Sequence, residues 1–393
     1  MTTGLMRGPS GDREDPQRTT LLELFFDLVF VAALALNSEM LARDLSWSGA
    51  FHSLLLLMAL WWVWSVTALV TDLYRRYRPP ILAMTIWVMF GSMVMAAALP
   101  KAFAGRGLLF AVAYVAIHGG RGLFLALALR GQQAERHAAR FLFWFGVSAA
   151  PWIVGALTPD AVHEALWSVA LAIDYGSARL RYPTPRLGRV PASQYDVAAG
   201  HLAERYQQFF TLALGTAILA TSLTFAGSAL TVSQAAAFLI AFATTVLLWR
   251  IYVYRAGTLL QATIESSRDP GKLLRSAPYT HLLMVAGVVA TAAGFEPVID
   301  HPTAHAMPGL AGVVLGGPAL FLAGRARFEY EVFSRVSLSR LVGLLALVVA
   351  AVAAALLPPI LMGAVAALVL GGIAVADAVR ARRGQPEEPS PAL

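Results

Sequence analysis

Cysteine is absent from this chain of 393 residues, which excludes disulfide scaffolds, zinc fingers, iron–sulfur centres and thiol nucleophiles. Charge is also scarce, since Asp, Glu, Lys and Arg make up 13% of the residues, about half the share found in soluble domains. Hydrophobic residues make up 58%, and the mean hydropathy is +0.64. So few charges could not cover the surface of a soluble globule of this size. The composition therefore excludes a soluble enzyme or a disordered protein and predicts a polytopic membrane protein.

The signatures of common enzymes are missing as well. The chain holds no Walker A loop and no H-E-x-x-H, G-x-S-x-G or S-x-x-K motif. We therefore predict no catalytic residues, no metal site and no cofactor, and we do not expect an enzyme. The net charge of +7 would suit a nucleic-acid partner, but the arginines lie in short clusters between apolar runs. The predicted partners are membrane lipids and an unknown small solute or ion, and not nucleic acid.

The apolar runs predict an all-α fold, a polytopic bundle of about 12 transmembrane helices. A spanning helix needs ~20 largely apolar residues. The candidates are residues 21–41, 49–72, 80–100, 107–129, 141–158, 161–178, 201–226, 233–254, 277–295, 306–324, 341–357 and 358–376. The fifth and sixth, and likewise the eleventh and twelfth, are separated only by short proline-containing breaks. Each of these two pairs could instead form one broken excursion into the membrane.

The distribution of Lys and Arg sets the predicted orientation, because cytoplasmic loops carry an excess of both. The termini and the loops after even-numbered helices together carry 24 of these residues, and the loops after odd-numbered helices carry three. A wrong helix count would invert this alternation beyond the error. We therefore predict a plasma (inner) membrane protein with both termini cytoplasmic.

A long proline-containing stretch near the middle divides the chain into two sets of six helices. Gly119–Ala126 resembles Gly316–Ala323, and Glu23 and Glu204 open the first and seventh helices in similar contexts. Because six is even, such halves would be parallel repeats. Coincidence is the alternative, since Gly, Leu and Ala are abundant here. The predicted organisation is an N-terminal cytoplasmic tail (1–20), a first half (21–178), a cytoplasmic linker (179–200), a second half (201–378) and a disordered C-terminal tail (379–393).

Ionisable residues within the apolar helices are the candidates for function, because a charge at the centre of a membrane helix is costly and usually faces the bundle interior or a cavity. Glu23 and Asp27 are four residues apart and so share one helix face. They could bind a cation or proton, or Glu23 could cap the membrane edge while Asp27 fixes packing by pairing with an arginine. The predicted solute- or ion-binding set is Glu23, Asp27, Arg121, Asp174, His201, Glu204, Arg205, His281 and Glu296. His281 taken alone more often indicates a satisfied core histidine than a ligand.

The predicted depths place most of this set near the cytoplasmic side. Asp27 and Arg121 lie roughly 9 and 12 Å from the cytoplasmic ends of their helices at ~1.5 Å per residue. We therefore predict that they pair, with Arg205 or Arg250 as alternative partners of Asp27. The predicted helices contain four carboxylates on this side (Glu23, Asp27, Asp174 and Glu204) but only three arginines (Arg121, Arg205 and Arg250) that could neutralise them. At least one carboxylate should then be protonated, exposed to water or bound to a cation.

Several motifs resemble the low temperature requirement A (LtrA) proteins of bacteria over about residues 18–330. These motifs are Glu23-Leu24-Phe25-Phe26-Asp27-Leu28-Val29-Phe30-Val31, Trp61-Trp62-Val63-Trp64, Ala102-Phe103-Ala104 followed by Phe110 and Arg121, His201-Leu202-Ala203-Glu204-Arg205, and a late set of His281, Gly287, Gly294, Glu296 and His301-Pro302. Members of that family often have Leu-Gly-Glu-Ser in the seventh helix. Here the residues are Leu214-Gly215-Thr216-Ala217, so Thr216 stands where a membrane-embedded carboxylate is usual. An activity that depends on that carboxylate would be altered in this chain.

The resemblance implies an integral membrane protein linked to growth in the cold, and it implies no molecular activity. Three hypotheses follow. The first is a proton- or cation-coupled transporter or ion pathway that uses the carboxylate and histidine cluster. The second is a non-catalytic membrane-adaptation protein whose charges are structural, and the third, less favoured, is an intramembrane enzyme acting on a lipid-like substrate. Transport predicts a water-accessible cavity beside the cluster, whereas a structural role predicts that every charge is paired and dry. The solute and the oligomeric state are not encoded in any motif.

Overall fold

The computed structural model describes residues 21–74, 78–131, 135–191, 199–266, 270–305, 309–354 and 357–382, and it holds helices and no strands over these residues. The predicted N-terminal tail and residues 383–393 of the predicted C-terminal tail lie outside the described residues. The helices are α1 (Leu21–Arg43), α2 (Trp47–Leu73), α3 (Arg78–Ala98), the short 3₁₀ helix η1 (Leu99–Lys101), α4 (Gly107–Ala128), α5 (Glu135–Ala156), α6 (Asp160–Arg179), α7 (Ala199–Gly227), α8 (Val232–Ser266), α9 (Pro270–Asp300), α10 (Leu310–Val314), α11 (Gly316–Phe333), α12 (Leu338–Ala353) and α13 (Pro359–Arg382). The predicted all-α bundle of about twelve helices is confirmed.

The two uncertain helix pairs, α5 with α6 and α12 with α13, are each two separate helices. The tenth predicted helix (306–324) differs, because it is broken at Leu315 into α10 and α11, and α11 continues to Phe333. Pro318 lies in the first turn of α11, where its missing N–H leaves no intrahelical bond unmade. The part of α11 beyond the predicted end, residues 325–333, carries several charged side chains. An ion pair between Arg327 and Glu331 (2.8 Å) links neighbouring turns there.

Nine of the described helices are long and apolar enough to span a membrane: all of α1 to α5, then α7, α8, α9 and α13. Helix α12, with 16 residues, is shorter than the usual span, while α6 and α11 carry several charged residues. These features identify a multi-pass membrane protein.

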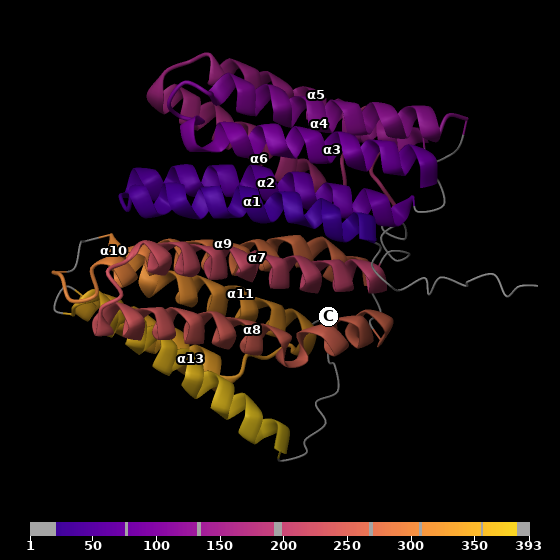
Figure 1. Ribbon diagram of the computed structural model, residues 1–393. Helices are drawn as coiled ribbons and strands as arrows, with labels where there is room; N and C mark the ends of the chain where they lie inside the picture. Colours follow the sequence, from indigo (N-terminus) through magenta and orange to yellow (C-terminus); the bar gives the residue numbers. More distant parts are fainter. Residues whose placement is uncertain are drawn as a thin grey trace, which may run out of the picture.

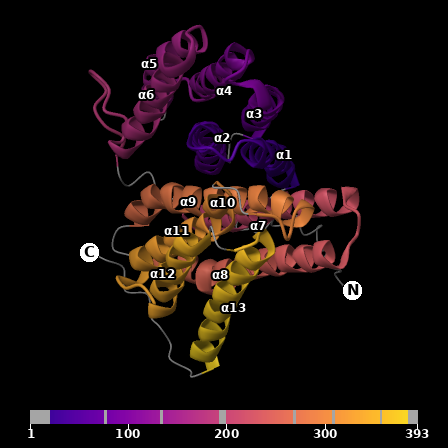
Figure 2. The ribbon, with the colours of Figure 1, turned by 90° about the vertical axis from the view of Figure 1, so that its left-hand side faces the viewer.

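The helices form two halves that pack against each other (Figures 1 and 2). Helices α1–α6 make up one half and α7–α13 the other, and α1 and α2 of the first half contact α7 and α9 of the second. The most hydrophobic stretch of α2 is 83% buried and that of α9 is 72% buried, the highest values among the nine candidate spans. The interface between the halves is therefore the core of the molecule.

Corresponding helices make corresponding contacts in the two halves. The pairs α1–α2, α3–α4, α5–α6, α1–α3, α4–α5 and α2–α6 are matched by α7–α8, α9–α11, α12–α13, α7–α9, α11–α12 and α8–α13. This is the pairing expected of two parallel repeats. It also puts the two similar segments, Gly119–Ala126 in α4 and Gly316–Ala323 in α11, at equivalent places.

Candidate functional site at the interface of the halves

Two polar residues of α1 face the second half. Glu23 and Asp27 lie one helical turn apart and are 6% and 0% exposed. Their face of α1 contacts α7, on which His201 and Arg205 are likewise one turn apart and buried. Since residues four apart share a helix face, the two pairs meet across the interface.

An ion pair between Asp27 and Arg205 lies at the centre of this contact. Nη2 of Arg205 donates to Oδ1 of Asp27 at 3.0 Å, and the indole N–H of Trp64 on α2 donates to the same oxygen at 2.7 Å. The guanidinium also approaches Glu23 at 3.5 Å and donates to the hydroxyl of Thr71 at 3.4 Å. Oδ2 of Asp27 is buried and has no hydrogen-bond partner among the described residues.

The predicted pairing of Asp27 with Arg121 is therefore wrong, and the alternative partner, Arg205, is the one observed. Arg121 instead donates to Thr67 of α2 at 3.0 Å, while Asp27 accepts from Trp64 of the same helix and from Arg205. Matching depths along the helices did not reveal which arginine is the partner of Asp27.

His201 joins a further carboxylate to the cluster. Its Nδ1 lies 2.8 Å from Oδ1 of Asp72 at the end of α2, and its Nε2 lies 3.6 Å from Oε2 of Glu23. Oδ2 of Asp72 is buried without a hydrogen-bond partner among the described residues. We call the set that bridges the halves the interface network, and it consists of Glu23, Asp27, Trp64, Asp72, His201 and Arg205.

Sequence reasoning missed Asp72. It lies at the last position of the predicted second helix, next to an arginine-rich loop, and so resembled an ordinary membrane-edge residue. The sequence did carry a signal for this residue. Thr71 and Asp72 directly follow the apolar residues 68–70, and Thr71 lies one helical turn beyond Thr67, so a polar helix face leads to Asp72.

The charges of Asp27 and Asp72 have one permanent counterion in the network, Arg205. Among the residues that the structure describes, the other network member that can carry a positive charge is His201, and it does so only when the ring is protonated. Glu23 adds a third carboxylate to the same cluster. The protonation of His201 therefore decides whether Asp72 faces a cation or a neutral ring.

Arg121 and Asp174 lie in a second polar cluster, within the first half. Tyr114 donates to Oδ2 of Asp174 at 2.7 Å, with Trp152 at 3.5 Å from the same oxygen. Arg121 contacts Nδ1 of His118 and forms no ion pair among the described residues. These two candidates are buried, and their printed hydrogen-bond partners are not residues of the interface network.

The remaining candidates lie elsewhere. Nδ1 of His281 is 2.9 Å from the carbonyl of Ala277 and its Nε2 is 3.2 Å from the hydroxyl of Tyr252, so both ring nitrogens have partners. Glu204 is half-buried on α7, about 100° round the helix from Arg205. Glu296 is half-buried near the end of α9, at the opposite end of the bundle from Glu23.

Thr216, the position at which the resemblance led us to expect a carboxylate, is 1% exposed on α7. Its hydroxyl donates to the carbonyl of Ala213 at 2.8 Å. The helix therefore satisfies this side chain without a partner from another helix, and no charge is buried there.

A second buried ion pair, between Arg340 and Asp377, shows what a fully satisfied carboxylate looks like in this protein. Nη1 and Nη2 of Arg340 donate to the two oxygens of Asp377, each at 3.1 Å, and Nε lies 3.3 Å from Glu329. Sequence reasoning missed this pair because Arg340 fell in a predicted loop and Asp377 just beyond the last predicted helix. Both oxygens of Asp377 are bonded, whereas Asp27 and Asp72 each keep one that is not.

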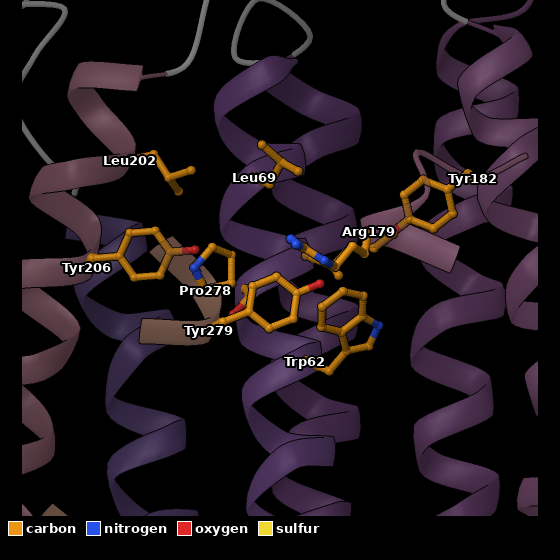
Figure 3. A pocket seen from close by; sticks show the side chains of 11 residues that line it. Trp62, Leu69, Arg179, Tyr182, Leu202, Tyr206, Pro278 and Tyr279 are labelled. Carbon is orange, nitrogen blue, oxygen red and sulfur yellow. The ribbon is translucent and has the colours of Figure 1, made fainter. Parts of the chain in front are cut away.

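A cavity lies beside the interface network, between α2, the end of α6, α7 and α9 (Figure 3). Its empty volume is about 560 Å³, which includes space open to the outside. Leu202 and Tyr206 of α7 line it, and each directly follows a network residue in sequence. The network and the cavity thus occupy adjacent faces of the same two turns of α7.

Comparison with known proteins identifies a family and a relative with similar sequences. The family model described as "Bacterial low temperature requirement A protein (LtrA)" matches residues 18–375. An uncharacterized protein of Rhizobium meliloti (strain 1021) is 38% identical over 319 residues, which cover 80% of this chain and 77% of that protein. No solved structure matches the chain.

Proposed function

The chain belongs to the bacterial low temperature requirement A family, and we propose that it is a proton- or cation-coupled transporter or ion pathway of the inner membrane rather than an enzyme. The family description names no molecular activity, so the proposal rests on the residues of this chain.

The observation that carries the proposal is the composition of the interface network. Asp27 and Asp72 are buried or nearly so, and each has one oxygen without a hydrogen-bond partner among the described residues. Within that described part of the chain, the permanent cation in the network is Arg205, which pairs with Asp27. A purely structural arrangement would satisfy both oxygens, as in the pair of Asp377 with Arg340. A carboxylate left partly unsatisfied in an apolar bundle has a site ready for a proton or a cation.

The location of the network supports the same function. Transporters built from repeats commonly place coupling-ion sites at the interface between the repeats, where rocking of one half against the other changes access. Here α1 and α2 supply the carboxylates and α7 supplies His201 and Arg205. A change in the charge of His201 would alter the attraction between the halves directly, because its neighbours Asp72 and Glu23 belong to the other half.

His201 is the residue we assign to proton coupling. When the ring is protonated, it forms an ion pair with Asp72, and when it is neutral that attraction is lost. Loading and release of one proton would therefore strengthen and weaken the contact between α2 and α7. With both termini cytoplasmic, as the Lys and Arg distribution predicts, the network lies on the cytoplasmic side.

The test is proton flux in liposomes that hold the purified full chain and the trapped pH-sensitive dye pyranine, with membrane potential clamped. After a pH step, in NaCl and then in KCl, wild type should change the internal pH faster than empty liposomes. His201→Gln should reduce the rate at least tenfold, because the amide cannot titrate. His281→Gln is the matched control, since it replaces a buried histidine outside the network whose two ring nitrogens both have partners, and it should retain the flux.

Equal rates for folded His201→Gln and wild type would contradict the assignment of His201. The absence of flux above empty liposomes in both salts, with folded protein verified by size exclusion, would contradict the ion-pathway form of the proposal. A coupled carrier that needs its solute would then be tested by adding the low-molecular-mass fraction of a bacterial extract to the same liposomes.

A further inference from the structure

We propose that Asp174 binds and releases a proton, as a second proton site that lies within the first half and outside the interface network. Asp174 is distinct from the residues of the proposed transport, and its proton exchange requires no ion to move through the network. Three features support this role: the neutral groups that bond Asp174, the position of Arg121, and the contrast with the corresponding carboxylate of the second half.

Asp174 of α6 is a buried carboxylate that neutral groups bond on one side only. The residue is 1% exposed. Its Oδ2 accepts from the hydroxyl of Tyr114 at 2.7 Å and from the indole N–H of Trp152 at 3.5 Å. Its Oδ1 is buried and has no hydrogen-bond partner among the described residues. An ionised carboxylate without a paired cation is costly to take out of water, and one proton on Oδ1 removes that charge.

An acceptor for this proton is at hand in α5. Ser148 lies beside Asp174, but its hydroxyl donates to the carbonyl of Phe145 at 3.2 Å. A serine hydroxyl that donates elsewhere keeps lone pairs for accepting. The protonated carboxyl group can therefore donate to Ser148 while Oδ2 still accepts from Tyr114.

Arg121 of α4 makes the ionised form of Asp174 tolerable as well. The guanidinium lies within electrostatic range of the carboxylate, yet it donates to Thr67 at 3.0 Å and contacts Nδ1 of His118 instead of bonding Asp174. Since Arg121 does not depend on Asp174 for its hydrogen bonds, it keeps its position when the carboxyl group is neutral. The carboxyl group can thus gain and lose a proton beside a fixed cation.

The other ionisable neighbour of Asp174 among the described residues is Tyr175, which directly follows it. The hydroxyl of Tyr175 donates to the carbonyl of Met58 on α2 at 2.9 Å, so α2 offers a backbone group at this contact. Helix α5 offers the neutral side chains of Ser148 and Trp152. The charge next to Asp174 therefore comes from α4 alone among these neighbouring helices.

The corresponding carboxylate of the second half is Asp377. Helices α5 and α6 match α12 and α13 in their contacts, and Asp174 and Asp377 each lie five residues before the last residue of their helices. Arg140 and Arg340 lie near the beginnings of α5 and α12. Two equivalent halves would therefore pair Arg140 with Asp174, as Arg340 pairs with Asp377.

The first half does not form that ion pair. Arg140 donates instead to the carbonyls of Leu187 and Gly188, beyond the end of α6, at 2.5 and 3.4 Å. Asp174 is left without the permanent partner that Asp377 has in Arg340. An opposite charge in contact with a carboxylate favours its ionised form, whereas burial favours the neutral form. The first half thus has a carboxyl group that can exchange a proton where the second half has a fixed ion pair.

The test is infrared difference spectroscopy of the purified full chain in detergent, titrated upward from about pH 5.5, where exposed carboxyl groups are mostly ionised. A protonated carboxyl group has a C=O stretching band that is separate from the amide bands and shifts in D₂O. Wild type should show such a band, and the band should be lost as the pH rises. Asp174→Asn should remove it. Asp44→Asn, which changes an exposed aspartate between α1 and α2, is the matched control and should keep it.

Two further measurements separate a proton site from a structural charge. Tyr114→Phe keeps the ring but removes the hydrogen bond to Oδ2, so it should move the band to higher frequency. Asn resembles a protonated Asp in shape and charge, so Asp174→Asn should unfold at nearly the denaturant concentration of wild type. Asp377→Asn strands Arg340 and should unfold at a much lower concentration.

A band that is absent throughout the titration, or that remains in folded Asp174→Asn, would overturn the proposal. A band that does not change with pH would also overturn it, because the carboxyl group would then hold its proton permanently. Failure of Asp174→Asn to fold, or a band unmoved in Tyr114→Phe, would count against it equally. No ion gradient is present in these measurements, so their outcome is separate from that of the flux assay.

Discussion

Breaking the ion pair between Asp27 and Arg205 should lower the free energy of unfolding, mainly because the buried charge of Arg205 loses its partner. In Asp27→Asn, the amide oxygen at the position of Oδ1 can still accept from Trp64 and Arg205, whose donor atoms lie 2.7 and 3.0 Å from that oxygen. The amide NH₂ replaces Oδ2, which has no hydrogen-bond partner among the described residues. The substitution therefore preserves the hydrogen bonds and removes the negative charge.

The expected loss follows from the burial of the remaining cation. Arg205 is 1% exposed, and removing one partner of a buried pair costs about 3–5 kcal/mol because the other charge stays buried. Glu23, at 3.5 Å, and the faces of the Phe26 and Trp64 rings, at 5.7 and 5.9 Å, still stabilise the guanidinium. These contacts place the expected loss for Asp27→Asn near the lower end, at about 3 kcal/mol.

A double-mutant cycle isolates the pair. Arg205→Gln should cost a similar amount, and the double variant should cost about 2–3 kcal/mol less than the sum, because neither charge is then stranded. The free energy of unfolding would be measured by reversible unfolding in mixed detergent and SDS micelles, followed by the loss of the circular dichroism of the helices. The control cycle pairs Asp27→Asn with Arg121→Gln, whose effects should add to within about 0.5 kcal/mol.

Additive losses for Asp27 and Arg205 would refute the observed pairing. Coupling between Asp27 and Arg121 instead would restore the pairing favoured by their depths and would require a different rotation of α1 or α4. Either result would also remove the bridge between the halves on which the proposed coupling depends.

Two further predictions concern orientation and packing. The chain has no cysteine, so single cysteines can report which side of the membrane a position faces. Cysteines at the exposed positions Gly227 and Thr303 should react with a membrane-impermeant maleimide from outside intact cells, and one at the exposed Arg189 should react only after lysis. Labelling of Arg189 from outside would overturn the predicted orientation. Gly287→Ala should cost about 1–3 kcal/mol by overpacking, since its new Cβ would lie 2.5 Å from a backbone nitrogen of α11, whereas Gly372→Ala, which meets nothing within 4 Å, should be neutral or stabilising in the same unfolding assay.

Four of the six residues of the interface network could be found in the sequence for a local physical reason. Glu23 and Asp27, and His201 and Arg205, are polar pairs spaced by four residues at the beginning of apolar helices. Spacing by four puts both members on one face, and the energetic cost of charge in the membrane turns that face inward. Their depth follows from counting residues at a fixed rise. That these residues lie in one cluster was therefore predictable, while their partners were not.

The residues that were missed lie where sequence rules are weakest. Asp72 and Asp377 are close to helix ends, where a charge can reach water and a boundary error of a few residues decides whether it counts as buried. Arg340 stood in a predicted loop for the same reason. The cavity was unpredictable because its walls come from α2, the end of α6, α7 and α9, and no single segment carries a sign of it.

The sequence by itself determined where most of the helices lie and their approximate number, because apolar length and proline-containing breaks act locally along the chain. Depth within the membrane is also local, since it follows from the position of a residue in its own helix. Only the tertiary structure decided that Asp27 pairs with Arg205, 178 residues away, rather than with Arg121. That choice depends on which helices are neighbours and how each is rotated about its axis. Both are fixed by packing among all the helices at once, and it is the packing of α1 against α7 that brings Asp27 to Arg205.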